Sequence, residues 1–170
     1  MGQMPLKGPC DVKPDQVEIL SQADIVKFLG IWYSLVRIPN ALESGECSTS
    51  LFNMLTPTLG FVTMWEVLDG VPRYWYASIT RDSNAPEKFI FSYNGQSLDY
   101  YILGTNYNGY ALLYSCQNTD DGNRNVWAWL MSRTRQFSPS LEELQGIQAA
   151  VERNPDVQNA SWVAVDQNNC

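Results

Sequence analysis

Short segments rich in aromatic and aliphatic residues alternate with turn-forming sequences over most of the chain. Turn sequences such as Asp69-Gly70 and Asn94-Gly95 separate these segments. Eight of them have the composition and length of β-strands, at residues 29–38, 48–55, 60–67, 73–80, 88–93, 98–105, 109–116 and 126–133. Connections this short cannot hold a crossover helix, so neighbouring strands are expected to run antiparallel.

Helical patterns flank the strands. The sequence from Ser21 to Asp24 has capping-box spacing and predicts one helical turn. Residues 138–153 begin with a cap and a proline, carry apolar residues at helical spacing, and end before Asn154-Pro155. A short extended piece at 160–165 is a candidate for a sheet edge.

The order of these elements predicts an all-β fold, in which eight antiparallel strands form a closed up-and-down β-barrel with one C-terminal α-helix packed outside. Closure leaves no open sheet edge. A two-sheet sandwich is the alternative from the pattern alone. We expect a single domain over residues 1–170, with a lead-in at 1–27, the barrel at 28–133, the helix at 138–153 and a tail at 154–170.

Charge and composition narrow the function classes. The chain has 11 Lys and Arg against 18 Asp and Glu, which gives a net charge of −7 and disfavours nucleic acid as a partner. It contains no histidine, so the usual general base and the commonest zinc ligand are missing. We therefore expect no metal site, no catalytic residues and no enzymatic activity.

No apolar run approaches the roughly 18 residues of a transmembrane segment. The N-terminus lacks the apolar stretch of a signal peptide, so we interpret the sequence as a mature chain with a start methionine.

The four cysteines, Cys10, Cys47, Cys116 and Cys170, are widely spaced, and no pair has C-x-x-C spacing. Two disulfides that fasten both tails are the favoured interpretation, which implies a secreted, extracellular protein. Four unpaired buried thiols are the alternative. Asn159 begins an Asn-Ala-Ser glycosylation sequon.

Three segments occur in the order and at about the distances typical of one family. They are Gly30-Ile31-Trp32, the stretch from Thr105 to Cys116, and Trp129-Leu130-Met131-Ser132-Arg133. Together they resemble the three signature regions of the lipocalins, and the flanking sequences are most similar to the branch that holds apolipoprotein D, insect bilin-binding proteins such as insecticyanin, and the crustacyanins. The resemblance runs over nearly the whole chain and implies the disulfides Cys10–Cys116 and Cys47–Cys170. Asn106 departs from the family pattern, which usually has Asp at this position.

The signature residues also have a structural interpretation. Gly30 permits a close approach at the start of the first strand. Trp32 is expected to plug the closed end of the barrel, and the guanidinium of Arg133 to lie over its indole.

An eight-stranded barrel is wide enough to hold one small ligand. Alternation from Trp32 predicts that Ser34 and Val36 line the interior. On the second and third strands we favour Ser50, Phe52, Met54, Phe61, Thr63 and Trp65, and a register slip of one residue is the alternative. The resemblance adds Tyr100, Ile102, Ala111, Leu113, Trp127 and Trp129, and Leu42 is a candidate lid residue.

The small and aromatic residues in this set predict a cavity for a planar conjugated molecule. The leading hypothesis is an extracellular carrier of a small hydrophobic pigment, either a bilin such as biliverdin or a carotenoid. Transport of a colourless fatty acid, steroid or retinoid is the alternative. Arg37, Arg73, Arg81 and Lys88 are candidates to meet an anionic group of a ligand, although ordinary solvated charges are the simpler interpretation.

Two further function classes stay open. Some lipocalins modify their ligands, but an enzyme here would need a free cysteine as nucleophile. Alternatively, the barrel could act as an interaction module in a homo- or hetero-oligomer, through aromatic residues expected on its outer face at Tyr33, Trp75 and Tyr101.

Overall fold

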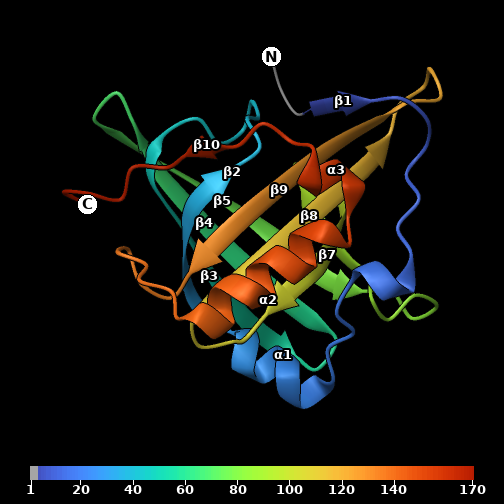
Figure 1. Ribbon diagram of the computed structural model, residues 1–170, viewed down its shortest axis with the longest axis horizontal. Coiled ribbons are helices and arrows are strands. Elements are labelled where there is room, and N and C mark those ends of the chain that lie inside the picture. The colour runs from blue at the N-terminus through green and yellow to red at the C-terminus, as the bar shows by residue number, and fades with distance from the viewer. Residues whose placement is uncertain (1–3) are drawn as a thin grey trace.

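The computed structural model describes residues 4–170 of the chain, so the first three residues of the expected lead-in lie outside the described residues. Eight antiparallel strands form a closed barrel: β2 (Gly30–Arg37), β3 (Glu46–Thr56), β4 (Leu59–Leu68), β5 (Val71–Arg81), β6 (Phe89–Tyr93), β7 (Gln96–Thr105), β8 (Tyr110–Asn118) and β9 (Arg124–Ser132). Each strand pairs with the next, and β9 also pairs with β2, which closes the barrel (Figure 1). The predicted barrel is confirmed, and the sandwich alternative is wrong.

Two short strands extend the sheet beyond the barrel. Strand β1 (Met4–Leu6) pairs with the first part of β9, and β10 (Val163–Ala164) pairs with the end of β2. The second of these falls within the extended piece expected at 160–165. Both chain ends are therefore joined to the barrel wall by backbone hydrogen bonds.

Four helical elements within residues 4–170 complete the fold. They are the 3-10 helix η1 (Pro14–Gln16), α1 (Gln22–Phe28), α2 (Leu141–Glu152) and α3 (Pro155–Gln158). Ser21 caps α1 in the expected capping box, but the helix has seven residues and not a single turn. In Figure 1, α1 lies at the foot of the barrel, and α2 lies across the outside of β7 and β8. No helix within residues 4–170 is long and apolar enough to cross a membrane.

The buried residues form two layers. One fills the barrel and includes Trp32, Phe52 and Trp129. The other lies between the barrel wall and α2 and includes Leu112 and Ala150. Helix and wall approach so closely that a Cβ added at Gly104 would lie 2.8 Å from the Cβ of Ala150. Glycine is therefore required where α2 crosses β7.

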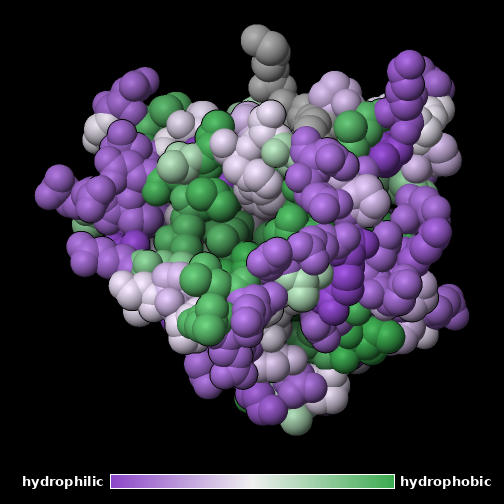
Figure 2. Space-filling model, in the orientation of Figure 1, coloured by the Kyte–Doolittle hydropathy of each residue, from purple (hydrophilic) through white to green (hydrophobic). Residues whose placement is uncertain are grey.

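Two disulfides fasten the tails. Cys10 is bonded to Cys116 on β8, and Cys47 on β3 is bonded to Cys170, the pairing that the resemblance implied. The C-terminal tail is held further by Gln167, whose Nε2 donates to the carbonyls of Ser34 and Ser48 at 2.8 and 2.9 Å. In Figure 2, apolar surface gathers left of centre, where Figure 1 labels β2 and β3, whereas the outer side of α2 is hydrophilic.

Candidate ligand-binding site

A hollow opens at the end of the barrel where residues 38–45 connect β2 to β3. We call this hollow the calyx. Its walls are rich in aromatic residues and methionine, and small side chains from β2, β3 and β5 leave room between them. The lining consists of Ser34, Asn40, Leu42, Glu43, Ser50, Phe52, Met64, Trp75, Ala77, Phe91, Tyr93, Gln96, Leu98, Tyr100, Leu113, Trp127, Trp129 and Met131. Three indoles and two phenols therefore surround one space and give it flat aromatic walls.

One carboxyl group projects into the calyx. Glu43 is only 7% exposed, and the indole N–H of Trp129 donates to its Oε2. Asn40 positions this part of the loop, because its Oδ1 accepts the backbone N–H groups of Leu42 and Glu43 at 3.1 and 2.8 Å. Burial raises the pKa of Glu43, although the nearby charge of Arg37 and the bond from Trp129 act against this shift.

Behind the loop lies a buried ion cluster, which we define as Arg37, Glu66 and Arg73. Glu66 is fully buried, forms an ion pair with Arg73, and lies 3.8 Å from Nη1 of Arg37. Its two carboxylate oxygens also accept the backbone N–H groups of Ser44 and Gly45, at 3.3 and 3.0 Å.

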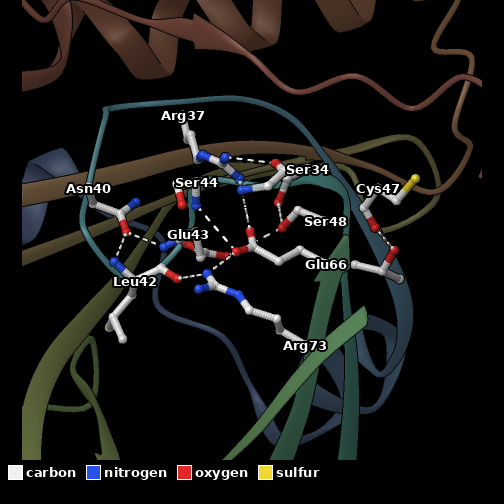
Figure 3. Close-up of polar contacts among 12 residues, drawn as sticks. Ser34, Arg37, Asn40, Leu42, Glu43, Ser44, Cys47, Ser48, Glu66 and Arg73 are labelled. Atoms are coloured by element: carbon white, nitrogen blue, oxygen red, sulfur yellow. Dashed lines mark hydrogen bonds and ion pairs between the residues drawn. The ribbon is translucent and has the colours of Figure 1, made fainter. Parts of the chain in front are cut away.

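The two arginines of the cluster also bind the loop directly. Arg37 donates to the carbonyl of Gly45 at 2.9 Å, and Arg73 donates to the carbonyl of Leu42 at 3.0 Å. Figure 3 shows how these groups converge. The ion cluster therefore fixes the loop that carries Glu43 and Leu42 over the calyx.

A layer of aromatic rings crosses the middle of the barrel. Tyr100 stacks on Phe91 with ring centroids 3.9 Å apart, and on Trp129 at 5.4 Å. Within residues 4–170 the Tyr100 hydroxyl has no hydrogen-bond partner, and burial together with the nearby charge of Glu43 raises the pKa of this phenol. Its O–H group is therefore available to a ligand.

The same layer separates the calyx from a second hollow beneath α1. We call this the closed-end pocket. Phe52, Phe91, Tyr100 and Leu113 line both spaces. The interior of the barrel thus has two compartments, one at each end.

The structure places most of the predicted lining residues inside the barrel. Ser34, Leu42, Ser50, Phe52, Tyr100, Leu113, Trp127 and Trp129 line the calyx, whereas Met54 and Ile102 line the closed-end pocket. Ala111 belongs to the interior cluster but lines neither compartment.

The predicted position of Val36 was wrong. The register of β2 against β9 shifts between Ser34 and Val36, so Val36 pairs with Leu130, which packs on the outer layer. This bulge breaks the alternation. It directs Val36 outward and places Arg37, the next residue, among the buried groups next to the calyx.

The third predicted strand has the expected bounds, but the favoured inward residues were wrong, and the alternative register, slipped by one residue, is the one observed. Phe61 is 40% exposed, and neither Thr63 nor Trp65 lines either compartment. Val62, Met64 and Glu66 face inward instead. The same slip affects the next strand. Trp75, expected outside, is buried and lines the calyx, and the exposed aromatic residues of β5 are Tyr74 and Tyr76, at 61% and 65%.

Several lining residues were not predicted. On β6, Phe91 and Tyr93 lie on either side of the polar Ser92. On β5, Trp75 and Ala77 alternate with the exposed Tyr74 and Tyr76, so both strands have a period-two pattern. Glu43 is also absent from the predicted lining residues. No sequence signal marks it as buried, because its burial depends on the fold of the whole loop.

The other end of the barrel carries the signature residues. Trp32 is fully buried, and its Nε1 donates to the carbonyl of Phe28 at 2.8 Å. The guanidinium of Arg133 lies 3.8 Å from the centroid of the Trp32 ring and donates to the carbonyls of Lys27, Ile31 and Tyr107, each at 2.9 Å. This arrangement fixes the C-terminal end of α1 on the barrel.

Asn106, the departure from the family pattern, has a partner in α2. Its Oδ1 accepts the backbone N–H groups of Gly109 and Tyr110, as an aspartate oxygen would. Its Nδ2 donates to Oε1 of Glu143 at 3.0 Å. An aspartate here would place two carboxylates together, so the amide suits this chain.

A closed barrel with one external helix, a hollow interior and aromatic walls is the architecture of proteins that bind a small ligand inside the sheet. A family model, the Lipocalin / cytosolic fatty-acid binding protein family, matches residues 73–163. This chain belongs to that family.

The relatives come from the branch that the signature segments indicated. Apolipoprotein D of Macaca fascicularis is 28% identical over 170 residues, which cover 96% of this chain and 85% of that protein. Insecticyanin-B of Manduca sexta is 23% identical, over 79% of this chain and 67% of that protein. Among solved structures, lobster apocrustacyanin A1 has a TM-score of 0.79 at 18% identity, over 96% of this chain and 91% of that one.

Proposed function

We propose that the protein is an extracellular carrier that holds a planar conjugated pigment, a bilin such as biliverdin or a carotenoid, in the calyx. The observation that supports this most is the stack of Phe91, Tyr100 and Trp129 beside two further indoles. Flat polarisable faces favour a flat ligand, and its burial supplies the affinity. This role needs no catalytic group.

Glu43 favours a bilin over a carotenoid. The carboxyl oxygens of Glu43 accept from the indole N–H of Trp129 and, at 3.4 Å, from the hydroxyl of Ser48, and their remaining lone pairs can accept pyrrole N–H groups, whereas a hydrocarbon chain offers no donor. The free hydroxyl of Tyr100 adds a donor for a carbonyl oxygen. The similarity to insecticyanin, from the branch with bilin-binding proteins that the signature segments indicated, supports this assignment.

Titration with biliverdin tests the proposal. We expect a shifted visible band and saturable quenching of tryptophan fluorescence, because three indoles line the calyx. Trp127→Leu should weaken binding about tenfold by removing one aromatic wall. Trp65→Leu is the matched control, since this strand tryptophan faces outward and its loss should leave the affinity unchanged.

The outcome discriminates between ligand classes. If a carotenoid such as astaxanthin binds with Trp127-dependent affinity and biliverdin does not, the bilin version is excluded. If neither pigment binds but retinol does, the alternative role in transport of a colourless lipid, as the similarity to apolipoprotein D suggests, replaces the pigment role. Equal effects of Trp127→Leu and Trp65→Leu would show that the ligand lies outside the calyx.

The extracellular location rests on the two disulfides, which persist in oxidising surroundings. Glycosylation of Asn159, which is exposed, and assembly into oligomers stay predictions. Any oligomer interface should be sought at Tyr74 and Tyr76, because Trp75 faces the calyx.

A further inference from the structure

The closed-end pocket lies between α1, the turn that joins β3 to β4, and the adjoining ends of β5 and β6. Its lining is almost entirely apolar. Leu20, Ile25 and Phe28 form one side, and Met54, Ile79 and Phe89 form the other. Unlike the calyx, it has no tryptophan and no carboxylate among the described residues that line it. Aliphatic side chains and phenylalanine rings suit an alkyl chain better than a polar-edged chromophore.

The pocket exists because α1 covers the end of the barrel incompletely. The C-terminal end of α1 is fixed by Arg133 and Trp32. Its N-terminal end contacts the barrel through Gln22, whose Nε2 lies 3.5 Å from Sδ of Met54. Between these two attachments, side chains of α1 form a roof, and the margin of the pocket reaches the turn at Pro57 and Thr58.

One positive charge lines the pocket. The guanidinium of Arg81 packs against the ring of Phe89, with Cζ 5.5 Å from the ring centroid. Its Nε donates to the carbonyl of Pro86 at 2.6 Å, which fixes the side chain. Within residues 4–170, Arg81 forms no ion pair, so its terminal Nη groups are available to an anion.

The neighbouring lysine does not share this property. Lys88 lies 3.1 Å from Asp82 and 3.6 Å from Asp99, and these carboxylates hold its pKa above the usual range. Among the described residues that line the pocket, Arg81 is the basic one, and its charge is not paired with a carboxylate. A guanidinium binds a carboxylate through two parallel hydrogen bonds.

We propose that the closed-end pocket is a second ligand site, which binds a long-chain fatty acid. The alkyl chain lies among the apolar side chains beneath α1, and the carboxylate pairs with Arg81. This site is separate from the calyx and goes beyond the proposed function, because the layer of Phe52, Phe91, Tyr100 and Leu113 divides the two compartments.

Calorimetric titration of the full chain with palmitate tests the site. Ile25→Trp should fill the pocket and weaken palmitate binding at least tenfold, while biliverdin binding stays unchanged. Val26→Trp is the matched control, since Val26 is the next residue of α1 but is exposed and absent from the lining. Arg81→Gln should weaken palmitate about tenfold by removing the charged partner, and should leave the affinity for methyl palmitate unchanged.

Each outcome decides one of the two proposals. Failure of palmitate to bind, or equal binding by Ile25→Trp and Val26→Trp, overturns the second site, as does competition with biliverdin that depends on Trp127. If Arg81→Gln weakens the affinity for palmitate and for methyl palmitate equally, the assignment of the carboxylate to Arg81 is overturned. Binding of palmitate that depends on Ile25, in a protein that binds neither biliverdin nor astaxanthin, supports the second site and overturns the pigment proposal instead. Because Arg81 lies at the end of a strand and is partly exposed, its variant keeps the test valid if Ile25→Trp fails to fold.

Discussion

The two ends of the barrel are built from the same eight strands but differ in what holds them together. At the calyx, a loop is fastened by buried charges, and a carboxyl group faces the interior. At the closed end, a helix is fastened by one arginine stacked on an indole, and the lining is apolar. The strands therefore supply a hollow at each end, while the covering segment determines its chemistry.

The largest effect is expected at the calyx end, from Glu66→Gln. The variant leaves the buried guanidinium of Arg37 without its counter-charge and weakens the attachment of residues 44 and 45. Removing one partner of a buried ion pair costs roughly 3 kcal/mol or more. We expect the free energy of unfolding, measured by urea denaturation, to fall by about this amount and biliverdin binding to weaken.

Glu46→Gln controls for the loss of a carboxylate, because Glu46 is exposed at the start of β3 and forms no ion pair within residues 4–170. Palmitate affinity of the folded Glu66→Gln protein should not change, since the closed-end pocket does not touch the ion cluster. A loss of stability no larger than in Glu46→Gln would show that the ion cluster does not hold the loop.

The matching change at the closed end is Arg133→Gln. It removes a cation–π contact with Trp32 and the bonds to Lys27 and Ile31, so we expect a loss of about 2 kcal/mol. Hydrogen exchange should increase in α1 and not in residues 38–45. Palmitate binding should weaken more than biliverdin binding.

Arg135→Gln is the appropriate control for that variant. Arg135 also lies over an aromatic ring, that of Tyr33 at 4.4 Å, but it bonds to Gln167 in the tail and not to α1. Equal exchange of the α1 amides in both variants would mean that Arg133 does not hold the helix.

The sequence predicted the strands well because turn residues mark their ends. Every predicted strand boundary lies within two residues of the observed one. The same signal cannot give the register where apolar residues occupy both faces of a strand, as they do from Phe61 to Trp65. Glu66 makes the problem worse, since a charged residue in a strand normally marks the outer face, and here it lies inside.

Two further features depend on contacts between distant segments. The bulge between Ser34 and Val36 interrupts an otherwise regular alternation, and nothing in the composition of β2 marks it. The closed-end pocket depends on where α1 lies relative to the turn at Pro57 and Thr58. Because spacing along the chain does not determine that placement, the sequence predicted one hollow where the structure has two.

The smallest expected effect is the pH dependence of stability that Glu43 causes, which distinguishes the calyx end of the barrel from the closed end. Burial raises the pKa of Glu43 from its ordinary value of 4.5, so the folded protein binds a proton there more readily than the unfolded chain. The resulting contribution to stability is present below the unfolded pKa and is lost as the pH rises through the higher pKa of the folded state. Glu43→Gln stays neutral and keeps an oxygen that can accept the bond from Trp129.

The free energy of unfolding of the wild type relative to Glu43→Gln should therefore fall as the pH is raised from about 4 to about 7. Urea denaturation of both proteins at a series of pH values measures this difference directly. A difference that stays constant over the range would mean that the carboxyl is solvated and not enclosed by the loop. Since the lining of the closed-end pocket contains no carboxylate, Arg81→Gln should show no such dependence against the wild type over the same range. A pH-dependent difference between the wild type and Glu43→Gln, with none between the wild type and Arg81→Gln, would therefore assign the buried carboxyl to the calyx end of the barrel.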